Sequence, residues 1–127
     1  MNGHILIADD DLFCRKSLKK LLESEGYGVD EAKSGKEVVN LLAGEYYDLG
    51  IYDYHLPNAG IASVLESVNV DLPFIIMTGD TSSQTEKLAR RLSPAFFFLK
   101  PIQMADLLNV VMRVLRIGEY EWRKSCW

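Results

Sequence analysis

Short apolar runs alternate with amphipathic stretches along the chain, and this alternation restricts the fold more than any other feature. Each apolar run is followed by a stretch whose apolar residues recur every three or four positions, which is the spacing of a helix. Strict alternation of strand and helix predicts an α/β domain, in which a parallel sheet carries helices on both faces. The five predicted strands are His4–Ala8, Tyr27–Glu31, Asp48–Tyr52, Pro73–Thr78 and Ala95–Leu99.

The predicted helices differ in how many apolar residues they carry. Ser34 and Glu37 fit a capping box that opens the second helix. The fourth helix, Thr81–Leu92, has few apolar positions, whereas the last helix, Gln103–Arg116, has many. The first helix is predicted over Leu12–Glu25, and a short third helix carries Ile61, Val64, Leu65 and Val68. The tail Gly118–Trp127 is polar and aromatic, with no helical period.

Composition places the chain among ordinary soluble domains. It has 127 residues, 48% of them hydrophobic and 25% charged, which predicts one globular domain. A net charge of −4 does not favour a nucleic-acid-binding surface. Neither a basic-then-apolar leader nor an apolar run of membrane-spanning length is present, so we expect a cytoplasmic protein without a membrane anchor. Cys14 and Cys126 are then expected to be reduced thiols.

Polar residues stand at the carboxyl ends of four predicted strands. Asp9 and Asp10 follow the first strand, Asp53 the third, and Lys100 the fifth, while Thr78 ends the fourth. The carboxyl ends of parallel strands meet at one edge of an open sheet, where such folds bind their ligands. We therefore expect three carboxylates, one hydroxyl and one ammonium group to converge at this edge.

Such a group of side chains suits phosphoryl chemistry. Two unit charges about 4 Å apart repel by roughly 4 kcal/mol near a protein surface, so clustered carboxylates either take up protons or bind a cation. Oxygen ligands favour Mg²⁺. The cation, the Lys100 ammonium and the Thr78 hydroxyl could together hold the oxygens of a transferring phosphoryl group. Asp53 is the candidate nucleophile, because it stands alone on its strand between the acid pair and Thr78.

The segments "ADD", "IYDYHLP", "IIMTGD" and "FFFLKP" closely resemble the receiver domain of response regulators in two-component signal transduction. The resemblance covers residues 4 to about 116, with each segment in order at the end of a strand. It implies a flavodoxin-like (βα)5 doubly wound sandwich whose five-stranded parallel sheet has the order 2-1-3-4-5. The receiver domain would then span residues 1–117, and residues 118–127 would form a C-terminal tail or the start of a linker.

The resemblance also assigns roles at the expected site. Asp53 would be the phosphoacceptor. Asp10, Asp53 and the backbone carbonyl of His55 would bind Mg²⁺ (or Mn²⁺) directly, and Asp9 would act mostly through metal-bound water. Thr78 would bond the phosphoryl group and move toward it.

Further assignments concern the lysine, the switch and the lifetime of the phosphoryl group. Lys100 would pair with a phosphoryl oxygen beside a Lys100–Pro101 bond that is usually cis in the family. Phe97 would be the switch aromatic, a position more often held by tyrosine. His55 and Asp80, each two residues beyond a site residue, would tune how long the phosphoryl group survives.

The loop Pro57–Gly60 is one residue shorter than is usual in the family. Asp11 is expected outside the metal site, at the start of the first helix, where a carboxylate suits the helix dipole.

The implied function is that of a signalling switch that catalyses its own phosphorylation and dephosphorylation, rather than that of an enzyme. A histidine kinase or histidine phosphotransfer protein would supply the phosphoryl group. The face formed by the fourth helix, the fifth strand and the last helix would bind an unknown downstream protein or form a dimer after phosphorylation. No nucleic acid is expected to bind through this domain.

Alternatives remain at this stage. A receiver-like interaction module that never turns over phosphate would have the same fold, although intact site residues disfavour it. A flavin-binding electron carrier needs a Ser/Thr/Gly-rich loop after the first strand, where this chain has the anionic "DDDLF". An aspartyl-nucleophile phosphatase needs a second acid two residues after the first, and "DYH" lacks it. Both a stand-alone protein and a receiver within a longer regulator fit the sequence.

Overall fold

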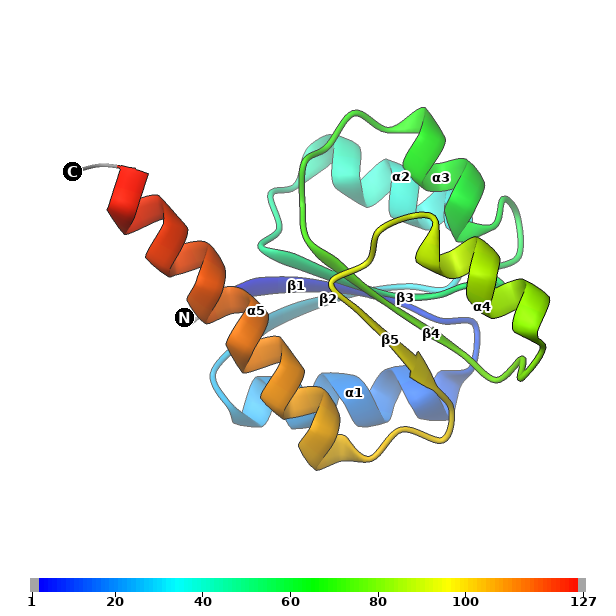
Figure 1. The fold of residues 1–127 in the computed structure, drawn as a ribbon, viewed down its shortest axis with the longest axis horizontal. Coiled ribbons are helices and arrows are strands. Elements are labelled where there is room, and N and C mark those ends of the chain that lie inside the picture. The colour runs from blue at the N-terminus through cyan, green and yellow to red at the C-terminus, as the bar shows by residue number, and fades with distance from the viewer. Residues whose placement is uncertain (1–2, 126–127) are drawn as a thin grey trace.

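The computed structural model describes residues 3–125, and it describes side chains as far as residue 116. Five strands alternate with five helices, and the strands form one parallel sheet in the order β2-β1-β3-β4-β5. Helices α1 and α5 cover one face of this sheet, while α2, α3 and α4 cover the other (Figure 1). The predicted fold class and strand order are confirmed.

The elements follow one another at short intervals. The strands are β1 His4–Ala8, β2 Gly28–Ala32, β3 Leu49–Asp53, β4 Phe74–Thr78 and β5 Phe96–Leu99. The helices are α1 Leu12–Ser24, α2 Gly35–Gly44, α3 Ile61–Ser67, α4 Ser83–Arg90 and α5 Met104–Ser125. Among the described residues, no helix combines the length and the apolar character that a membrane span requires.

The strands form a core on each face of the sheet because successive side chains of a strand point to opposite sides. Ile7 belongs to the cluster under α1 and α5, whereas Leu6 belongs to the cluster under α2, α3 and α4. Every residue of β3 is buried. Pairing keeps the carboxyl ends of the strands level, since Asp53 is aligned with Met77 and Thr78 with Leu99. The register therefore brings the polar residues that follow these strands to one edge.

Capping side chains begin the helices beside that edge. Asp11 is the N-cap of α1, and its Oδ1 accepts hydrogen bonds from the backbone N–H groups of Phe13 and Cys14 at 2.9 and 3.2 Å. Asp11 thus lies at the helix start, as expected. At α2, the Ser34 hydroxyl accepts from the backbone N–H of Glu37 at 3.2 Å. The return bond of the predicted capping box comes from the backbone N–H preceding Ser34, which donates to Glu37 Oε1.

The last helix is longer than predicted. We expected it to end at Arg116, but α5 continues to Ser125. The added segment contains no proline and several good helix formers, so backbone propensity extends the helix where no apolar period marks it. Cys126 and Trp127 lie outside the described residues, and a domain boundary at residue 117 stays a prediction.

The aromatic run of β5 is only partly buried, whereas its apolar pattern suggested a core strand. Phe97 points into the core and is 8% exposed, but Phe96 on the other face is 45% exposed. Phe98 packs partly against the cluster under α1 and α5. The difference arises because β5 is the edge strand of the sheet, and the helices cover an edge strand incompletely.

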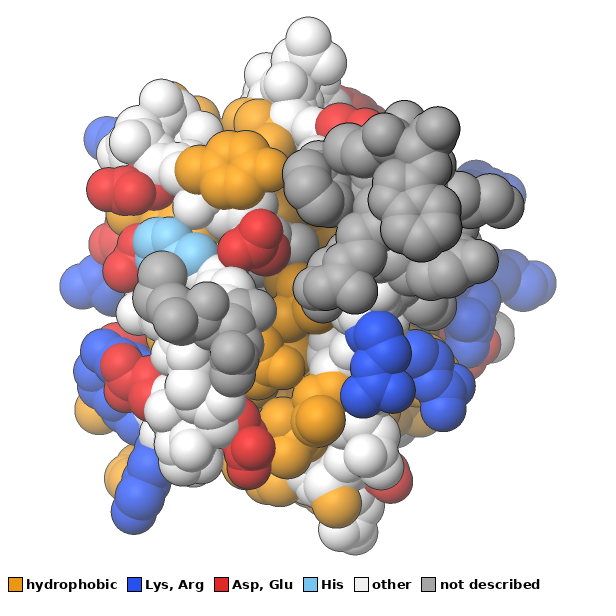
Figure 2. All heavy atoms as spheres, turned by 90° about the vertical axis from the view of Figure 1, so that its left-hand side faces the viewer, with side chains coloured by type: hydrophobic (Ala, Val, Ile, Leu, Met, Phe, Trp, Pro, Cys, Tyr) orange, Lys and Arg blue, Asp and Glu red, His pale blue; other side chains and the backbone are white. Residues whose placement is uncertain are grey.

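The amino ends of the strands lie at the opposite pole of the molecule. On this face scattered charges surround a strip of apolar side chains (Figure 2). His4 places Nε2 3.0 Å from Asp30 Oδ2 and Nδ1 3.0 Å from the carbonyl oxygen of Tyr46. The Tyr47 hydroxyl donates to the same carboxylate oxygen of Asp30 at 2.7 Å. These bonds tie β1 and β2 to the loop that precedes β3.

Glu31 on β2 is a largely buried acid with three cationic neighbours. Its side chain is 16% exposed and accepts from Arg15 at 3.0 Å, Lys16 at 2.8 Å and Lys19 at 3.3 Å. Burial alone would raise the pKa of Glu31, but the three hydrogen bonds outweigh burial and lower it. Because this pKa is lower in the folded than in the unfolded protein, the ionised form of Glu31 stabilises the fold.

We expect Glu31→Gln to lower the free energy of unfolding by about 1 kcal/mol at pH 7. This contribution is complete above the unfolded pKa of about 4.3 and is lost as the pH falls through the lower folded value. Urea unfolding at pH 7 and at about pH 3 should therefore show a difference between variant and wild type that shrinks in acid. Glu23→Gln, at an exposed position of α1, is the matched control. An equal effect at both pH values would contradict the expectation.

Candidate functional site

Three carboxylates gather at the carboxyl ends of β1 and β3. Asp9 and Asp10 directly follow β1, and Asp53 is the last residue of β3. Each offers one oxygen, and these oxygens all lie within 4.8 Å of one another. Asp9 is fully buried and Asp53 is 7% exposed, whereas Asp10 faces solvent. The sequence placed these three acids at one edge, and the structure brings them together.

Lys100 joins two of the acids. Its Nζ lies 2.6 Å from Asp9 Oδ2 and 2.7 Å from Asp53 Oδ2. Its backbone N–H donates to the carbonyl oxygen of Thr78 at 2.8 Å, which fixes the lysine beside β4. The bond to Pro101 is cis, as the resemblance implied.

The charges of the site change the pKa values of its groups. Burial raises the pKa of Asp53 above its usual range, although hydrogen bonds from Lys100 and from the backbone of His55 partly oppose this. Burial alone would lower the pKa of Lys100, but Asp53 and Asp9 outweigh it and raise that pKa. The Lys100 ammonium therefore keeps its charge at neutral pH, whereas burial disfavours the ionised form of Asp53, the candidate phosphoacceptor.

The donor set fits a hard divalent cation. Three carboxylates faced by one ammonium leave an excess of two negative charges when all are ionised. Backbone N–H groups already orient two of the acids, since Asp11 donates to Asp9 Oδ1 and His55 donates to Asp53 Oδ1, each at 2.9 Å. Carboxylate oxygens with a solvent-facing side suit Mg²⁺, which keeps several waters when bound to protein.

Thr78 and Phe97 lie where the sequence analysis placed them. Thr78 ends β4 and is fully buried, and its Oγ1 accepts from the backbone N–H of Asp80 at 3.0 Å. Phe97 on β5 belongs to the core cluster under α4. The guanidinium carbon of Arg90 lies 5.2 Å from the centre of the Phe97 ring, a distance typical of a cation–π contact.

Asp80 connects residues that the sequence analysis treated separately. Its Oδ2 lies 3.1 Å from Nε2 of His55 and accepts from the Thr85 hydroxyl at 2.6 Å. Its Oδ1 accepts from the backbone N–H of Ser82 at 2.9 Å. These bonds hold the pKa of Asp80 well below its usual range, with the Thr85 hydroxyl as the largest cause. Thr85 could not be identified from the sequence, because a threonine within a helix carries no signal that its hydroxyl bonds a residue in the preceding loop.

Cys14 lies beside the site but is not activated by it. Burial, with a hydrogen bond to Asp9, raises the pKa of the Cys14 thiol to about 12. A thiol that stays protonated at neutral pH is a poor nucleophile. Cys14 is a free thiol, as expected.

The shortened loop after β3 packs tightly on α2. Asn58 and Ala59 both adopt left-handed backbone conformations, with φ of 52° and 79°. The backbone N–H of Gly35 donates to the carbonyl oxygen of Pro57 at 2.9 Å, and a Cβ at Gly35 would lie 1.8 Å from the carbonyl oxygen of Ala59. Only glycine fits there. The loop borders an open hollow of about 440 Å³ that reaches Asp10.

Comparison with known proteins gives a consistent result. The family model of the response regulator receiver domain matches residues 5–112. The response regulator MprA of Mycolicibacterium vanbaalenii is 32% identical over 91% of this chain and 52% of its own length. The aerobic respiration control protein ArcA of Escherichia coli is 31% identical over 91% of this chain and 51% of its own length. The chain therefore spans about half the length of these curated relatives.

A solved structure gives the same result. The CheY-like response regulator receiver domain protein of Methanospirillum hungatei superimposes with a TM-score of 0.85 at 29% identity. The match covers 93% of this chain and 97% of that protein's chain. Fold and sequence thus agree on one family.

Proposed function

The chain belongs to the family of response regulator receiver domains, a family of phosphorylation-based signalling switches, and on this premise we propose that Asp53 accepts a phosphoryl group from a histidine kinase or a histidine phosphotransfer protein. The observation that carries this proposal is the Lys100 ammonium placed 2.7 Å from Asp53 and 2.6 Å from Asp9. It holds positive charge where phosphoryl oxygens would arrive. The proposed donor also implies a cytoplasmic location.

In the proposed reaction, an Asp53 carboxylate oxygen attacks the phosphorus atom as the bond to the donor nitrogen breaks. Asp10, Asp53 and the carbonyl of His55 would hold Mg²⁺ or Mn²⁺, with Asp9 acting through water. The bound ion would supply charge that stabilises the phosphoryl oxygens. Lys100 would transfer its hydrogen bond from Asp53 to a phosphoryl oxygen, and the Thr78 hydroxyl would donate to another.

A second part of the proposal concerns the output. An aspartyl phosphate carries about −1.5 to −2 charges in place of the single charge of the carboxylate, and it brings new acceptor oxygens. These would draw Thr78 inward and favour the buried position of Phe97. Helix α4 suits a mobile element, because its buried residues are only Thr85 and Ala89. We propose that the surface of α4, β5 and α5 reports the change.

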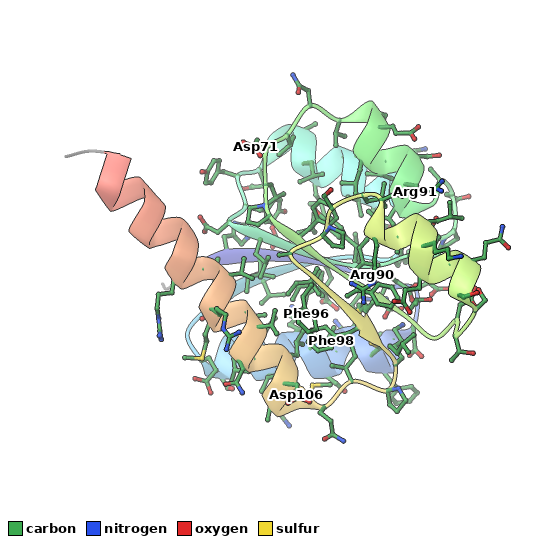
Figure 3. All side chains as sticks on the ribbon, in the orientation of Figure 1. Asp71, Arg90, Arg91, Phe96, Phe98 and Asp106 are labelled. Carbon is green, nitrogen blue, oxygen red and sulfur yellow. The ribbon has the colours of Figure 1, made fainter. Side chains whose placement is uncertain are left out.

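This proposed output face has the chemistry of an interaction surface. The rings of Phe96 and Phe98 lie 4.7 Å apart on β5, and the elements beside this strand carry charged residues: Arg90 at the end of α4, Arg91 directly after it and Asp106 on α5 (Figure 3). An exposed Phe96 beside a half-buried Phe98, with charged residues of both signs nearby, suits a protein partner. The partner would be a downstream protein or a second copy of the chain, and sedimentation of the phosphorylated protein distinguishes them.

The proposed lifetime residues act beside the aspartyl phosphate. The contact between His55 and Asp80 spans the distance from the loop after β3 to the loop after β4. We expect His55→Ala to speed hydrolysis of the phosphoryl group about fivefold, the effect of losing one hydrogen bond of ~1 kcal/mol, because water gains access. Loss of added mass over time measures the rate. Slower hydrolysis in this variant would instead indicate that His55 activates the water.

Incubation with acetyl phosphate tests the proposed function. With Mg²⁺ present, intact mass should rise by one phosphoryl group, and peptide mapping should place it on Asp53. Chelation of the metal should abolish the reaction. If the protein folds but gains no mass from acetyl phosphate or from a phosphorylated histidine donor, the proposed function is wrong. The alternative function, a receiver-like interaction module without phosphate turnover, would then hold.

A further inference from the structure

We propose that Thr85 is a positioning residue, which couples the Thr78 hydroxyl to helix α4 through Asp80. The inference rests on the proposed function and adds a route by which phosphorylation of Asp53 reaches α4. Within the described residues, the hydrogen bonds of Thr85 go to Asp80 and Ser82 rather than to the three site carboxylates or Lys100.

Asp80 is bonded on two sides. Its backbone N–H donates to Thr78 Oγ1 at 3.0 Å, so its main chain is attached to the site hydroxyl. Its carboxylate accepts from the Thr85 hydroxyl at 2.6 Å and from the backbone N–H of Ser82 at 2.9 Å, so its side chain is attached to the start of α4. These bonds form a continuous path from Thr78 to the helix.

The Thr85 bond is the strongest connection to the body of the helix. A hydroxyl that donates to a carboxylate over such a short distance forms a charge-assisted hydrogen bond. Thr85 is buried within α4, whereas Ser82 is only the N-cap and its bonds serve the helix end. A local turn explains why Asp80 accepts from Ser82, but it does not explain a threonine hydroxyl buried against the same carboxylate.

The geometry allows Thr78 to pull on this path. A threonine hydroxyl can donate one hydrogen bond and accept two. Thr78 can therefore donate to a phosphoryl oxygen while it still accepts from the Asp80 N–H. When Thr78 moves toward the phosphoryl group, Asp80 is drawn with it, and the first turn of α4 follows through Thr85. This route does not involve Phe97.

The test compares Thr85→Val, which removes the hydroxyl at similar volume, with Thr85→Ser, which keeps it. Each protein is treated with acetyl phosphate and Mg²⁺, and intact mass gives the extent of phosphorylation. Amide hydrogen exchange over residues 82–90 is then measured with and without phosphorylation, along with exchange in β5. Thr85→Ala provides the same comparison if the valine variant does not fold.

We expect wild type and Thr85→Ser to show the same phosphorylation-dependent change in α4. In Thr85→Val that change should fall to less than about a third in the first turn, because loss of a hydrogen bond to a charged group leaves the helix start uncoupled, while the mass gain stays within about twofold. An unchanged α4 response in fully phosphorylated Thr85→Val would overturn the inference alone. Absence of mass gain in wild type would overturn the proposed function as well.

Discussion

Asp53→Asn is expected to take up no phosphoryl group from acetyl phosphate, whereas wild type becomes phosphorylated. The asparagine amide lacks the nucleophilic oxygen of the carboxylate. Loss of the Asp53 carboxylate also removes one of the three charges that favour a divalent cation at the site. The rate of mass gain at this residue should fall below detection, a loss of at least about a hundredfold. Intact mass after incubation with Mg²⁺ measures it.

The same variant should be more stable than wild type when no metal is added. The pKa of Asp53 is raised by burial in the folded protein. A group of this kind stabilises the fold below its unfolded pKa of about 3.9 and loses that contribution as the pH rises through the folded value. At neutral pH the ionised Asp53 is therefore a cost that asparagine removes, and added Mg²⁺ should raise the melting temperature of wild type more than that of the variant.

Asp71→Asn is the matched control, because Asp71 is an exposed acid in the loop before β4 (Figure 3). It should be phosphorylated as wild type is and should respond to Mg²⁺ equally. Added mass on the Asp53→Asn protein would place the phosphoryl group on another residue. Equal melting temperatures for wild type and Asp53→Asn at neutral pH would show that Lys100 fully neutralises the buried charge.

The site was predictable from sequence because the fold fixes it through backbone register. Parallel pairing aligns the carboxyl ends of the strands, so the alternating pattern placed Asp9, Asp53 and Lys100 at one edge, and the strand order implied by the family resemblance made their strands near neighbours. The same argument located Thr78. Asp11 could be assigned to the helix start because an N-cap depends only on neighbouring residues.

Features that depend on packing between distant side chains were not predictable. The Thr85 hydroxyl and the His55 ring both reach Asp80 across loop conformations that no periodicity encodes. The exposure of Phe96 follows from how much of the sheet edge the helices cover, and its apolar character alone suggested burial. Helix α5 extends past Arg116 and through Gly118 because a segment that lacks proline and contains several good helix formers continues a helix even where no apolar stripe is present.

Lys100→Met should impair both phosphorylation and folding. Among the described residues, the ammonium is the only cation that pairs with the carboxylates of Asp9 and Asp53. Without it, two largely buried carboxylates lose their partner, and breaking a buried ion pair on one side costs about 3 kcal/mol. Removal of one preorganised donor to the transferring group typically slows a reaction about a hundredfold to a thousandfold. Denaturant unfolding and the rate of mass gain measure the two effects.

The two effects should separate with pH and with charge-preserving substitution. Burial raises the pKa of Asp53. Because protonation of Asp53 removes its repulsion with Asp9, the stability difference between Lys100→Met and wild type should shrink as the pH falls through that raised pKa. Lys100→Arg should recover part of the stability but little of the rate, since a planar guanidinium cannot replace a compact ammonium between two carboxylate oxygens.

Lys87→Met, at an exposed position of α4, should match wild type in both measurements. Rapid phosphorylation of Lys100→Met would mean that the metal alone neutralises the phosphoryl group, and that Lys100 serves only to hold Asp9 and Asp53 together.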